Sequence, residues 1–374
     1  MRAEHEVAHV LDRLWGKIDS LRLNNWQILT LRALKDCRTG TLGGHIDACD
    51  GCGHIQISYN SCRNRHCPKC QGHKRLQWIQ AREAELLPIP YFHVVFTLPD
   101  DLNAHALHKP KLVYDALFKA AWETIKAFTG KHNKAGMISI LHTWGQNLSL
   151  HPHIHCIIPG GFLDRTQNWK RSKADGKFLF PVKAMSKVFR AKYVALLRSS
   201  DLEVEQSTYD ALFKKQWVVY AKRPFGSPSS VVEYLGRYTH KIAISNHRIL
   251  AIDDHTVTIR YKDYRAEGQK KTMTLSHDEF IRRFALHILP KRFVRIRHYG
   301  FLSSTWKHTK LVVLQAKITG ITAVKMSEVK KVSHHNSCPC CKTGQMITLM
   351  TFGRRGPPSE YYKATPQNPN SYVA

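Results

Sequence analysis

The stretch His151-Pro-His-Ile-His-Cys-Ile-Ile-Pro-Gly-Gly161 predicts a strand, because it is rich in isoleucine and ends in two glycines. Successive side chains of a strand point to opposite faces, so His153 and His155 share one face and can hold a metal ion together. A second strand is predicted directly before it, at 136–144. A turn between the two would pair them antiparallel and bring the residues from His142 to Gln146 near the two histidines.

The patterns on either side of this pair predict an α+β fold, in which helices pack on an antiparallel sheet. Further strands are expected at 91–98 and 216–221, and a hairpin at 249–264 and 271–275. Helices are expected at 5–35, 76–87, 111–128, 185–200, 229–239 and 278–289. The motif Pro88-Ile-Pro90 ends the second of these helices, because proline removes a backbone donor and restricts the residue before it.

Composition indicates a partner with negative charge. The 374 residues include 57 Lys and Arg against 28 Asp and Glu, a net charge of +29. Such a field attracts polyanions, and nucleic acid is favoured over a membrane surface. The sequence has no apolar run of the roughly 18 residues that a membrane helix needs, and no signal-peptide pattern at its start. We therefore expect no membrane partner and a cytoplasmic location, in a bacterium and on the nucleoid when DNA is bound.

Cysteines occur in clusters with histidines beside them, which in a reducing compartment indicates zinc. Two C-x-x-C pairs, Cys49/Cys52 and Cys67/Cys70, predict one structural Zn²⁺ held by four sulfurs. The interleaved residues predict a second Zn²⁺, and they are Cys37, His45, Cys62 and His66. The alternative is that these two cysteines are small core residues and the two histidines contact DNA or backbone.

Two further features of the sequence concern possible zinc sites: arginines within the first cysteine cluster, and a second cysteine pair near the C-terminus. Arg63 and Arg65 lie inside the cluster and suit phosphate contacts, so we interpret the module as DNA-binding and not catalytic. Near the C-terminus, Cys338 and Cys341 have the spacing of a zinc pair, but no second pair follows them. A zinc ion there would need His334, His335 or ligands from elsewhere.

Two tyrosines lie four residues apart in Val231-Val-Glu-Tyr-Leu-Gly-Arg-Tyr-Thr-His-Lys241, on one face if the segment is helical. Tyrosines at this spacing are usually a core stripe. The basic residues near Tyr234 and Tyr238 instead favour a helix that faces phosphate. These basic residues are Arg237, Lys241 and Arg248.

Taken together, these motifs resemble the rolling-circle insertion-sequence transposases of the HUH endonuclease superfamily, of the two-tyrosine type with an N-terminal zinc-binding domain. The resemblance spans about residues 30–305. It rests on the cysteines from Cys49 to Cys70, Phe92-His-Val-Val-Phe-Thr-Leu-Pro99, His142-Thr-Trp-Gly145, the histidine strand and Tyr234-Leu-Gly-Arg-Tyr238. It implies a replication-initiator-like nuclease fold that acts on single-stranded DNA and on the hairpins of transposon ends.

The resemblance also assigns roles. Tyr234 and Tyr238 match the nucleophiles that become joined to a DNA 5′ end, and His153 and His155 match the metal ligands. A phenol with a pKa near ~10 attacks poorly at neutral pH, so a divalent ion such as Mg²⁺ or Mn²⁺ is expected to polarise the phosphate. For the third ligand we expect Gln146, with Asn147 and His142 as alternatives.

The expected organisation has five parts: a helical lead-in at 1–36, the zinc module and a linking helix at 37–90, the nuclease domain at 91–250, a DNA-binding extension at 251–330 and a tail at 331–374. From 282 to 331 there are twelve Lys and Arg, with aromatic residues such as Phe293, Tyr299, Phe301 and Trp306 interspersed. This composition suits single strands, because the rings can stack on bases while the cations follow the backbone. Two other functions stay open: a plasmid replication initiator or relaxase, and a non-enzymatic zinc-dependent DNA-binding regulator. The oligomeric state is not indicated.

Overall fold

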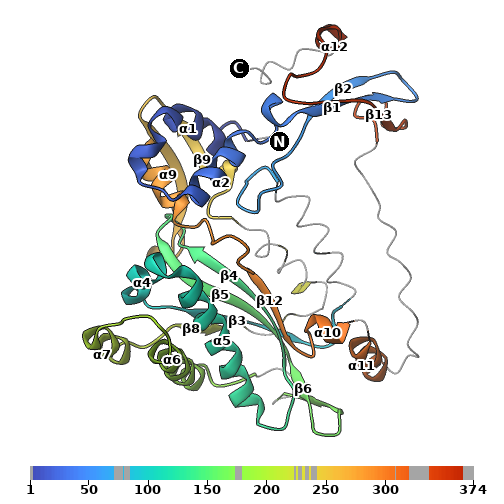
Figure 1. Ribbon diagram of the computed structural model, residues 1–374. Helices are drawn as coiled ribbons and strands as arrows, with labels where there is room; N and C mark the ends of the chain where they lie inside the picture. Colours follow the sequence, from blue (N-terminus) through green and yellow to red (C-terminus); the bar gives the residue numbers. More distant parts are fainter. Residues whose placement is uncertain are drawn as a thin grey trace. The chain divides into compact units, whose positions relative to one another are not determined.

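The computed structural model describes residues 3–70, 79, 85–172, 179–222, 225, 230–231, 236, 242–307, 309–319 and 337–364 (Figure 1). The chain divides into two compact units, and one of them is discontinuous in sequence. Unit 1 comprises Met1–Gln71 together with Met326–Ala374, and unit 2 comprises Gly72–Lys325. The expected separate tail therefore belongs with the N-terminal residues, and most of the expected DNA-binding extension lies in the same unit as the histidine strand.

Unit 1 begins with the helices that the sequence predicts for residues 5–35. They are α1 (Val7–Leu14), the 3-10 helix η1 (Trp15–Leu21) and α2 (Asn25–Lys35). The start of α2 is fixed by a capping box, in which Asn24 and Gln27 bond each other's backbone N–H groups. The apolar faces of the two α-helices pack together and bury Leu11 and Leu31 completely.

Unit 1 also contains a three-stranded antiparallel sheet that joins distant parts of the chain. A short 3-10 helix, η2 (Gly40–Leu42), leads into β1 (Gly44–Cys49), which pairs with β2 (Ile55–Tyr59) on one side and with β13 (Met346–Phe352) on the other. A final helix, α12 (Ser359–Ala364), follows. β13 ends at Phe352, which pairs with Gly44 at the start of β1.

Unit 2 is organised around a five-stranded sheet in the order β12-β4-β5-β3-β8, with every neighbouring pair antiparallel. The strands are β3 (Tyr91–Thr97), β4 (Gly136–Trp144), β5 (Leu150–Pro159), β8 (Val219–Ala221) and β12 (Ile296–Gly300). The predicted strands at 91–98, 136–144 and 151–161 are thus confirmed, and so is the antiparallel turn between the last two. The expected α+β class with an antiparallel sheet is confirmed as well.

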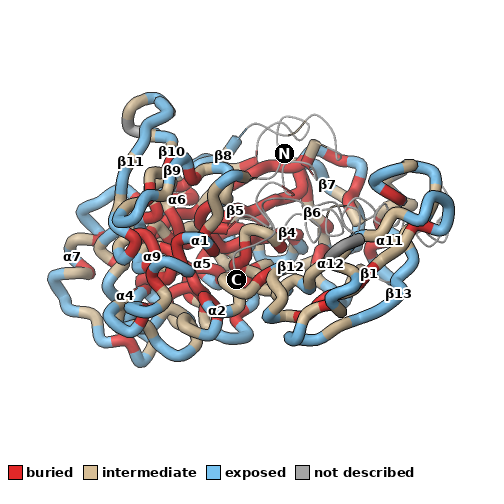
Figure 2. Tube along the Cα trace, turned by 90° about the horizontal axis from the view of Figure 1, so that it is seen from above, coloured by how far each residue is buried: buried red, intermediate tan, exposed pale blue. Residues whose placement is uncertain are grey.

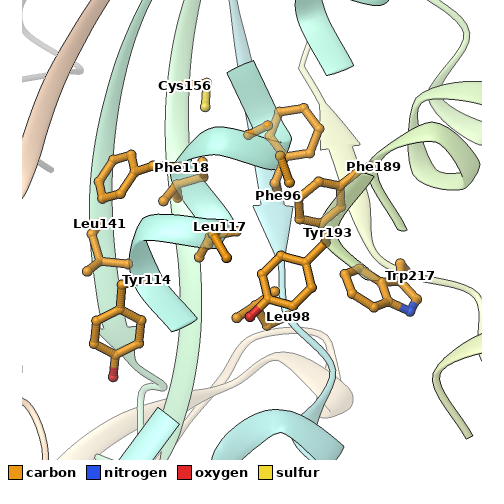
Figure 3. Close-up of a cluster of buried hydrophobic side chains, with 14 of the residues drawn as sticks. Phe96, Leu98, Tyr114, Leu117, Phe118, Leu141, Cys156, Phe189, Tyr193 and Trp217 are labelled. Carbon is orange, nitrogen blue, oxygen red and sulfur yellow. The ribbon is translucent and has the colours of Figure 1, made fainter. Parts of the chain in front are cut away.

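Helices cover one face of this sheet. They are α4 (Asn103–His108), α5 (Pro110–Thr129), α6 (Val182–Arg198) and α7 (Gln206–Lys214), with the 3-10 helix η3 (Asp100–Leu102) before them. Figure 3 shows the core between this layer and the sheet, where Phe96 and Phe189 lie 4.9 Å apart between ring centroids. Figure 2 shows β4 and β5 as buried along most of their length. Because this face is filled with apolar side chains, the opposite face is the one that can carry a polar site.

Residues 242–319 add smaller elements to unit 2. They are the 3-10 helices η4 (Asn246–Arg248) and η5 (Tyr264–Ala266), the strands β9 (Ile249–Ile252), β10 (Thr256–Asp263) and β11 (Gln269–Ser276), and the helices α9 (His277–Ala285), α10 (Ser304–Lys307) and α11 (Lys310–Thr319). The expected hairpin is a three-stranded sheet, because Asp253 accepts hydrogen bonds that turn the chain between β9 and β10. A two-stranded ribbon, β6 (Gly161–Leu163) with β7 (Trp169–Arg171), follows β5.

Aromatic residues of the basic segment 282–331 pack inside the protein, contrary to the expectation that they stack on DNA bases. Phe293 and Phe301 are buried, and Tyr299 stacks on Trp122 with 5.1 Å between ring centroids. The amino-acid composition cannot distinguish a ring that faces a base from one that faces the core.

Most of the residues of the helices expected at 76–87 and 229–239 lie outside the described residues. Among the residues that the structure describes, no helix has the length and apolar character needed to cross a membrane.

Candidate metal sites

Three histidines converge on the face of the sheet that α5 and α6 do not cover. His153 and His155 alternate with Ile154 on β5, and His142 on β4 lies directly opposite His153 in the antiparallel register. One ring nitrogen from each of the three histidines lies within 4.8 Å of the others. Side-chain alternation on two paired strands therefore produces the cluster without any special backbone geometry.

Backbone and side-chain hydrogen bonds fix which nitrogen of each β5 histidine would face an ion. The His153 Nδ1 lies 2.7 Å from the His151 carbonyl oxygen, so Nδ1 carries the proton and donates it. The His155 Nδ1 lies 2.8 Å from the Nε2 of His93. With both Nδ1 atoms engaged in this way, Nε2 is the metal-facing donor of each ring, an arrangement typical of metal-binding histidines.

His93 is a residue whose role the sequence analysis missed. It lies on β3, is 2 % exposed, and its ring stacks on His155 with 5.1 Å between ring centroids. Burial, together with the nearby charge of Lys222, lowers the pKa of His93 to about 4. A neutral His93 can accept a hydrogen bond from the His155 Nδ1–H and so orient that ring. The alternation of Phe92-His-Val-Val-Phe already places His93 on one face, but the sequence does not say that β3 lies beside β5.

The chemistry of the three donors limits which ions fit. Imidazole nitrogens suit borderline transition metals better than Mg²⁺, which prefers oxygen. Three protein ligands leave coordination positions for a substrate, as catalytic sites require. His142, His153 and His155 therefore suit a divalent ion whose remaining coordination positions are free for a substrate.

Gln146, the expected third ligand, lies in the turn between β4 and β5, where its backbone carbonyl accepts a hydrogen bond from Arg248. The strand register instead places His142, one of the two alternatives to Gln146, beside His153 and His155. His142 precedes the turn on β4, and its ring stacks on Trp144 with 4.6 Å between ring centroids.

The β4–β5 turn is held by three downstream side chains, each of which donates to one of three successive carbonyls. Arg248 donates to Gln146, Arg283 to the Asn147 carbonyl at 3.2 Å, and His287 to the Leu148 carbonyl at 3.1 Å. Leu148 has a φ of 63°, a left-handed conformation that is costly for leucine. We call Arg248, Arg283 and His287 the turn clamp. The amino-acid sequence suggested a different role for Arg248 and gave no indication of a role for Arg283 or His287.

The DNA-phosphate contact expected of Arg248 stays a prediction, but its hydrogen bonds give this side chain a structural role. Its guanidinium also donates to the carbonyls of Arg260 at 2.8 Å and Ala243 at 3.4 Å, and burial lowers its pKa. A guanidinium that donates to three backbone carbonyls uses most of its N–H donors inside the protein. Arg248 therefore supports the turn.

Tyr234, Tyr238, Arg237 and Lys241 lie outside the described residues, so their expected roles stay predictions. One described neighbour is informative. Val231, three residues before Tyr234, is fully buried in a core cluster that also contains Ile140 and Ile157. Ile140 on β4 lies opposite His155, and Ile157 on β5 comes two positions after His155. Val231 is thus packed on the same sheet face that carries the histidines.

Unit 1 contains two groups of four cysteines, but the pairs combine differently from the prediction. Cys67 and Cys70 lie with Cys37 and Cys62, and not with the other C-x-x-C pair. Cys49 and Cys52 lie with Cys338 and Cys341. The four-sulfur set expected from Cys49, Cys52, Cys67 and Cys70 is therefore wrong, because local spacing defines each pair but not its partner.

The group of Cys37, Cys62, Cys67 and Cys70 has the geometry of a structural metal site. The sulfurs of Cys37 and Cys70 are 3.5 Å apart, and those of Cys62 and Cys70 are 3.7 Å apart. Backbone N–H groups point at the sulfurs: Cys62 donates to Cys37 Sγ at 3.4 Å, and Asn64 donates to Cys62 Sγ at 3.5 Å. These donors favour thiolates, the form that binds zinc.

The two histidines expected at the second zinc are not among the sulfur groups. His45 lies on β1, where its Nε2 is 3.3 Å from the Asp47 carboxylate. His66 is buried, and its backbone N–H donates to the Asn64 side chain. Arg63 is exposed in the same loop, and burial lowers the pKa of Arg65. The phosphate contacts expected of these two arginines stay predictions.

Comparison with known proteins identifies the class. A family described as "Transposase zinc-binding domain" matches residues 9–98, and one described as "Putative transposase" matches residues 136–310. The chain is 43 % identical over 394 residues to "Putative transposase y4qJ" of Sinorhizobium fredii, across 96 % of this chain and 98 % of that protein. It is 28 % identical over 305 residues to the "Transposase for insertion sequence element IS801" of Pseudomonas savastanoi pv. phaseolicola, across 75 % and 72 %. No solved structure matches.

The protein is thus a DNA-binding transposase with a zinc-binding domain. The chain belongs to the IS91/IS801 family of transposases, which transpose by a rolling-circle route and therefore cleave DNA and transfer strands.

Proposed function

We propose that unit 2 is a nuclease of the HUH type, in which Tyr234 and Tyr238 cleave and rejoin single-stranded DNA at transposon ends beside His142, His153 and His155. The observation that supports this most is the convergence of three imidazoles on the uncovered face of a central antiparallel pair. The buried position of Val231 on that face is a second support, because the tyrosine segment continues from it.

The chemical step balances without an energy source. A tyrosine hydroxyl loses its proton, its oxygen forms a bond to phosphorus, and the bond from phosphorus to the 3′ oxygen breaks. The 5′ end of the downstream piece is then joined to tyrosine, and the 3′ oxygen of the upstream piece of the same strand takes up a proton to become a 3′-hydroxyl. One phosphodiester replaces another, so a later 3′-hydroxyl can reverse the step. Two tyrosines four residues apart on a helix would allow two such cleavages in one cycle.

The three histidines are the residues that would hold the divalent ion, with His142 in the place first given to Gln146. When bound, the ion would supply Lewis-acid stabilisation of charge on the phosphate oxygens. The protein contributes orientation: the His151 carbonyl and His93 hold the two rings of β5. The turn clamp holds the loop that joins His142 to His153. Arg63 and Arg65 in unit 1, with Arg237 and Lys241 beside the tyrosines, are proposed to contact phosphates.

Adduct formation tests this function. The protein is incubated with single-stranded oligonucleotides that carry a transposon end and its hairpin, with Mn²⁺, and examined on a denaturing gel. We expect a covalent adduct with wild type and with Tyr264→Phe, a matched control at a tyrosine that is 72 % exposed on η5. The double change Tyr234→Phe and Tyr238→Phe should abolish the adduct. An adduct that persists would refute the nucleophile assignment.

The alternatives give different results in the same assay. A DNA-binding regulator would shift the oligonucleotide on a native gel and form no adduct. A plasmid initiator or relaxase would form an adduct with its own origin sequence and not with transposon ends. His142→Ala should abolish the adduct, whereas His132→Ala, at an exposed position, should not.

A further inference from the structure

We propose that Cys49, Cys52, Cys338 and Cys341 hold a second structural zinc ion, which fastens the C-terminal segment 337–364 to the N-terminal zinc module. The four sulfurs lie within 4.8 Å of one another. Cys338 and Cys341 lie outside the matched zinc-binding domain, which covers residues 9–98. The ion would therefore be bound by two segments that are 286 residues apart along the chain.

Sulfur–sulfur distances distinguish a metal site from disulfides. The sulfurs of Cys49 and Cys341 are 3.6 Å apart, and those of Cys52 and Cys338 are 3.7 Å apart. A Zn–S distance of about 2.3 Å sets the corners of a tetrahedron about 3.8 Å apart. A disulfide would require about 2.05 Å. The spacing thus fits four thiolates around one ion, and both of these contacts join one segment to the other.

The two segments form matching turns around their sulfurs. In the first, the N–H groups of Gly51 and Cys52 donate to Cys49 Sγ at 3.4 and 3.5 Å. In the second, the N–H of Cys340 donates to Cys338 Sγ at 3.4 Å, and the N–H of Gly344 donates to Cys341 Sγ at 3.2 Å. Such bonds stabilise thiolates and are made by tight turns that present two sulfurs to one ion.

The two turns also touch each other directly. A Cβ atom on Gly344 would lie 2.4 Å from Cys49 Sγ and 2.9 Å from the Asp50 carboxylate, so only glycine fits. Asp50 in turn accepts a hydrogen bond from the Gln345 N–H at 2.7 Å, and its own N–H donates to the Gln345 carbonyl at 3.0 Å. These contacts hold the second turn against the first and place the four sulfurs together.

Apolar burial in β13 cannot supply the stability of this attachment. On β13, Ile347 is 54 % exposed, Leu349 is 56 % exposed and Met350 is 36 % exposed. The strand is held to β1 by backbone hydrogen bonds and by one side-chain bond, from the Thr348 hydroxyl to Asp47 at 2.7 Å. Where few apolar groups are buried, the binding energy of an ion becomes folding energy.

Metal analysis of the full-length protein tests the proposal. We expect the double change Cys338→Ser and Cys341→Ser to lose one zinc ion per chain relative to wild type. Cys340→Ser is the matched control, since Cys340 lies between the two and is exposed and outside the group. It should keep the full zinc content. Equal zinc content in the double variant and wild type, or iron in place of zinc, would overturn the proposal.

A second measurement uses the wild-type protein and so does not depend on how a variant folds. Thiol alkylation followed by mass spectrometry should modify Cys340 at once, and Cys49, Cys52, Cys338 and Cys341 only after a chelator is added. Hydrogen exchange in β13 should rise at the same chelator concentration. Alkylation of Cys338 and Cys341 as fast as Cys340, without chelator, would refute the site. Both measurements omit DNA, so their failure would leave the proposed nuclease intact.

Discussion

Replacing His93 with phenylalanine should weaken metal binding without removing a ligand. Phenylalanine keeps a flat ring of similar size against His155, but it cannot accept the bond that now joins His93 Nε2 to His155 Nδ1 at 2.8 Å. Loss of such a supporting bond lowers metal affinity by about 10- to 100-fold. This corresponds to about 1.4–2.7 kcal/mol, because 1.4 kcal/mol is a factor of ten.

The assay separates affinity from catalysis. Loss of the free Mn²⁺ signal in electron paramagnetic resonance gives the dissociation constant, and adduct formation is then measured as a function of Mn²⁺ concentration. We expect His93→Phe to move the midpoint to higher Mn²⁺ and to leave the plateau near that of wild type. His93→Gln, whose carbonyl can accept a hydrogen bond, should recover part of the affinity. An unchanged midpoint, or a lower plateau at an unchanged midpoint, would refute the assigned role of His93.

Three further predictions follow from the site and its surroundings. Gly344→Ala should cost one zinc ion, because its Cβ would lie 2.4 Å from Cys49 Sγ, whereas Gly353→Ala, with no atom within 4 Å of its Cβ, should cost none in the same metal analysis. Burial lowers the pKa of His287 from 6.5 to about 4, so its stabilising effect is complete above pH 6.5 and is lost as the pH falls toward 4. Urea unfolding at pH 7.5 and pH 5 should therefore show wild type losing about 2 kcal/mol more than His287→Gln, which does not titrate, and equal losses would contradict this. Because the three proposed ligands are all imidazoles, adduct formation should need less Mn²⁺ than Mg²⁺, and equal requirements for the two ions would argue for an oxygen ligand.

The sequence predicted the parts of the site that depend on neighbours along the chain. Strand alternation places His153 and His155 on one face, and a short turn brings His142 opposite to them. Both are properties of about twenty consecutive residues, and both follow from the period of a strand. Which of the residues near the turn faces the histidines could not be predicted, because this depends on the bulge in the β4–β5 register.

Pairings between distant segments could not be predicted from the sequence. Each C-x-x-C spacing was recognised, but nothing in the spacing of Cys49 and Cys52 indicates that their partners are Cys338 and Cys341. The sequence likewise suggested that the ring of Phe301 stacks on a DNA base, whereas Phe301 is completely buried. Burial and metal sharing are decided by the tertiary fold, and a local pattern is compatible with several outcomes.

The turn clamp has a consequence for how this enzyme can be divided. Arg248, Arg283 and His287 come from downstream of the residues that make up the histidine strands, and β12 pairs with β4 from still further along the chain. A fragment that stops near residue 250 would expose one edge of β4 and leave two of the three carbonyls at its hairpin without their donors. A minimal catalytic fragment for crystallisation or genome engineering therefore has to extend through residue 300.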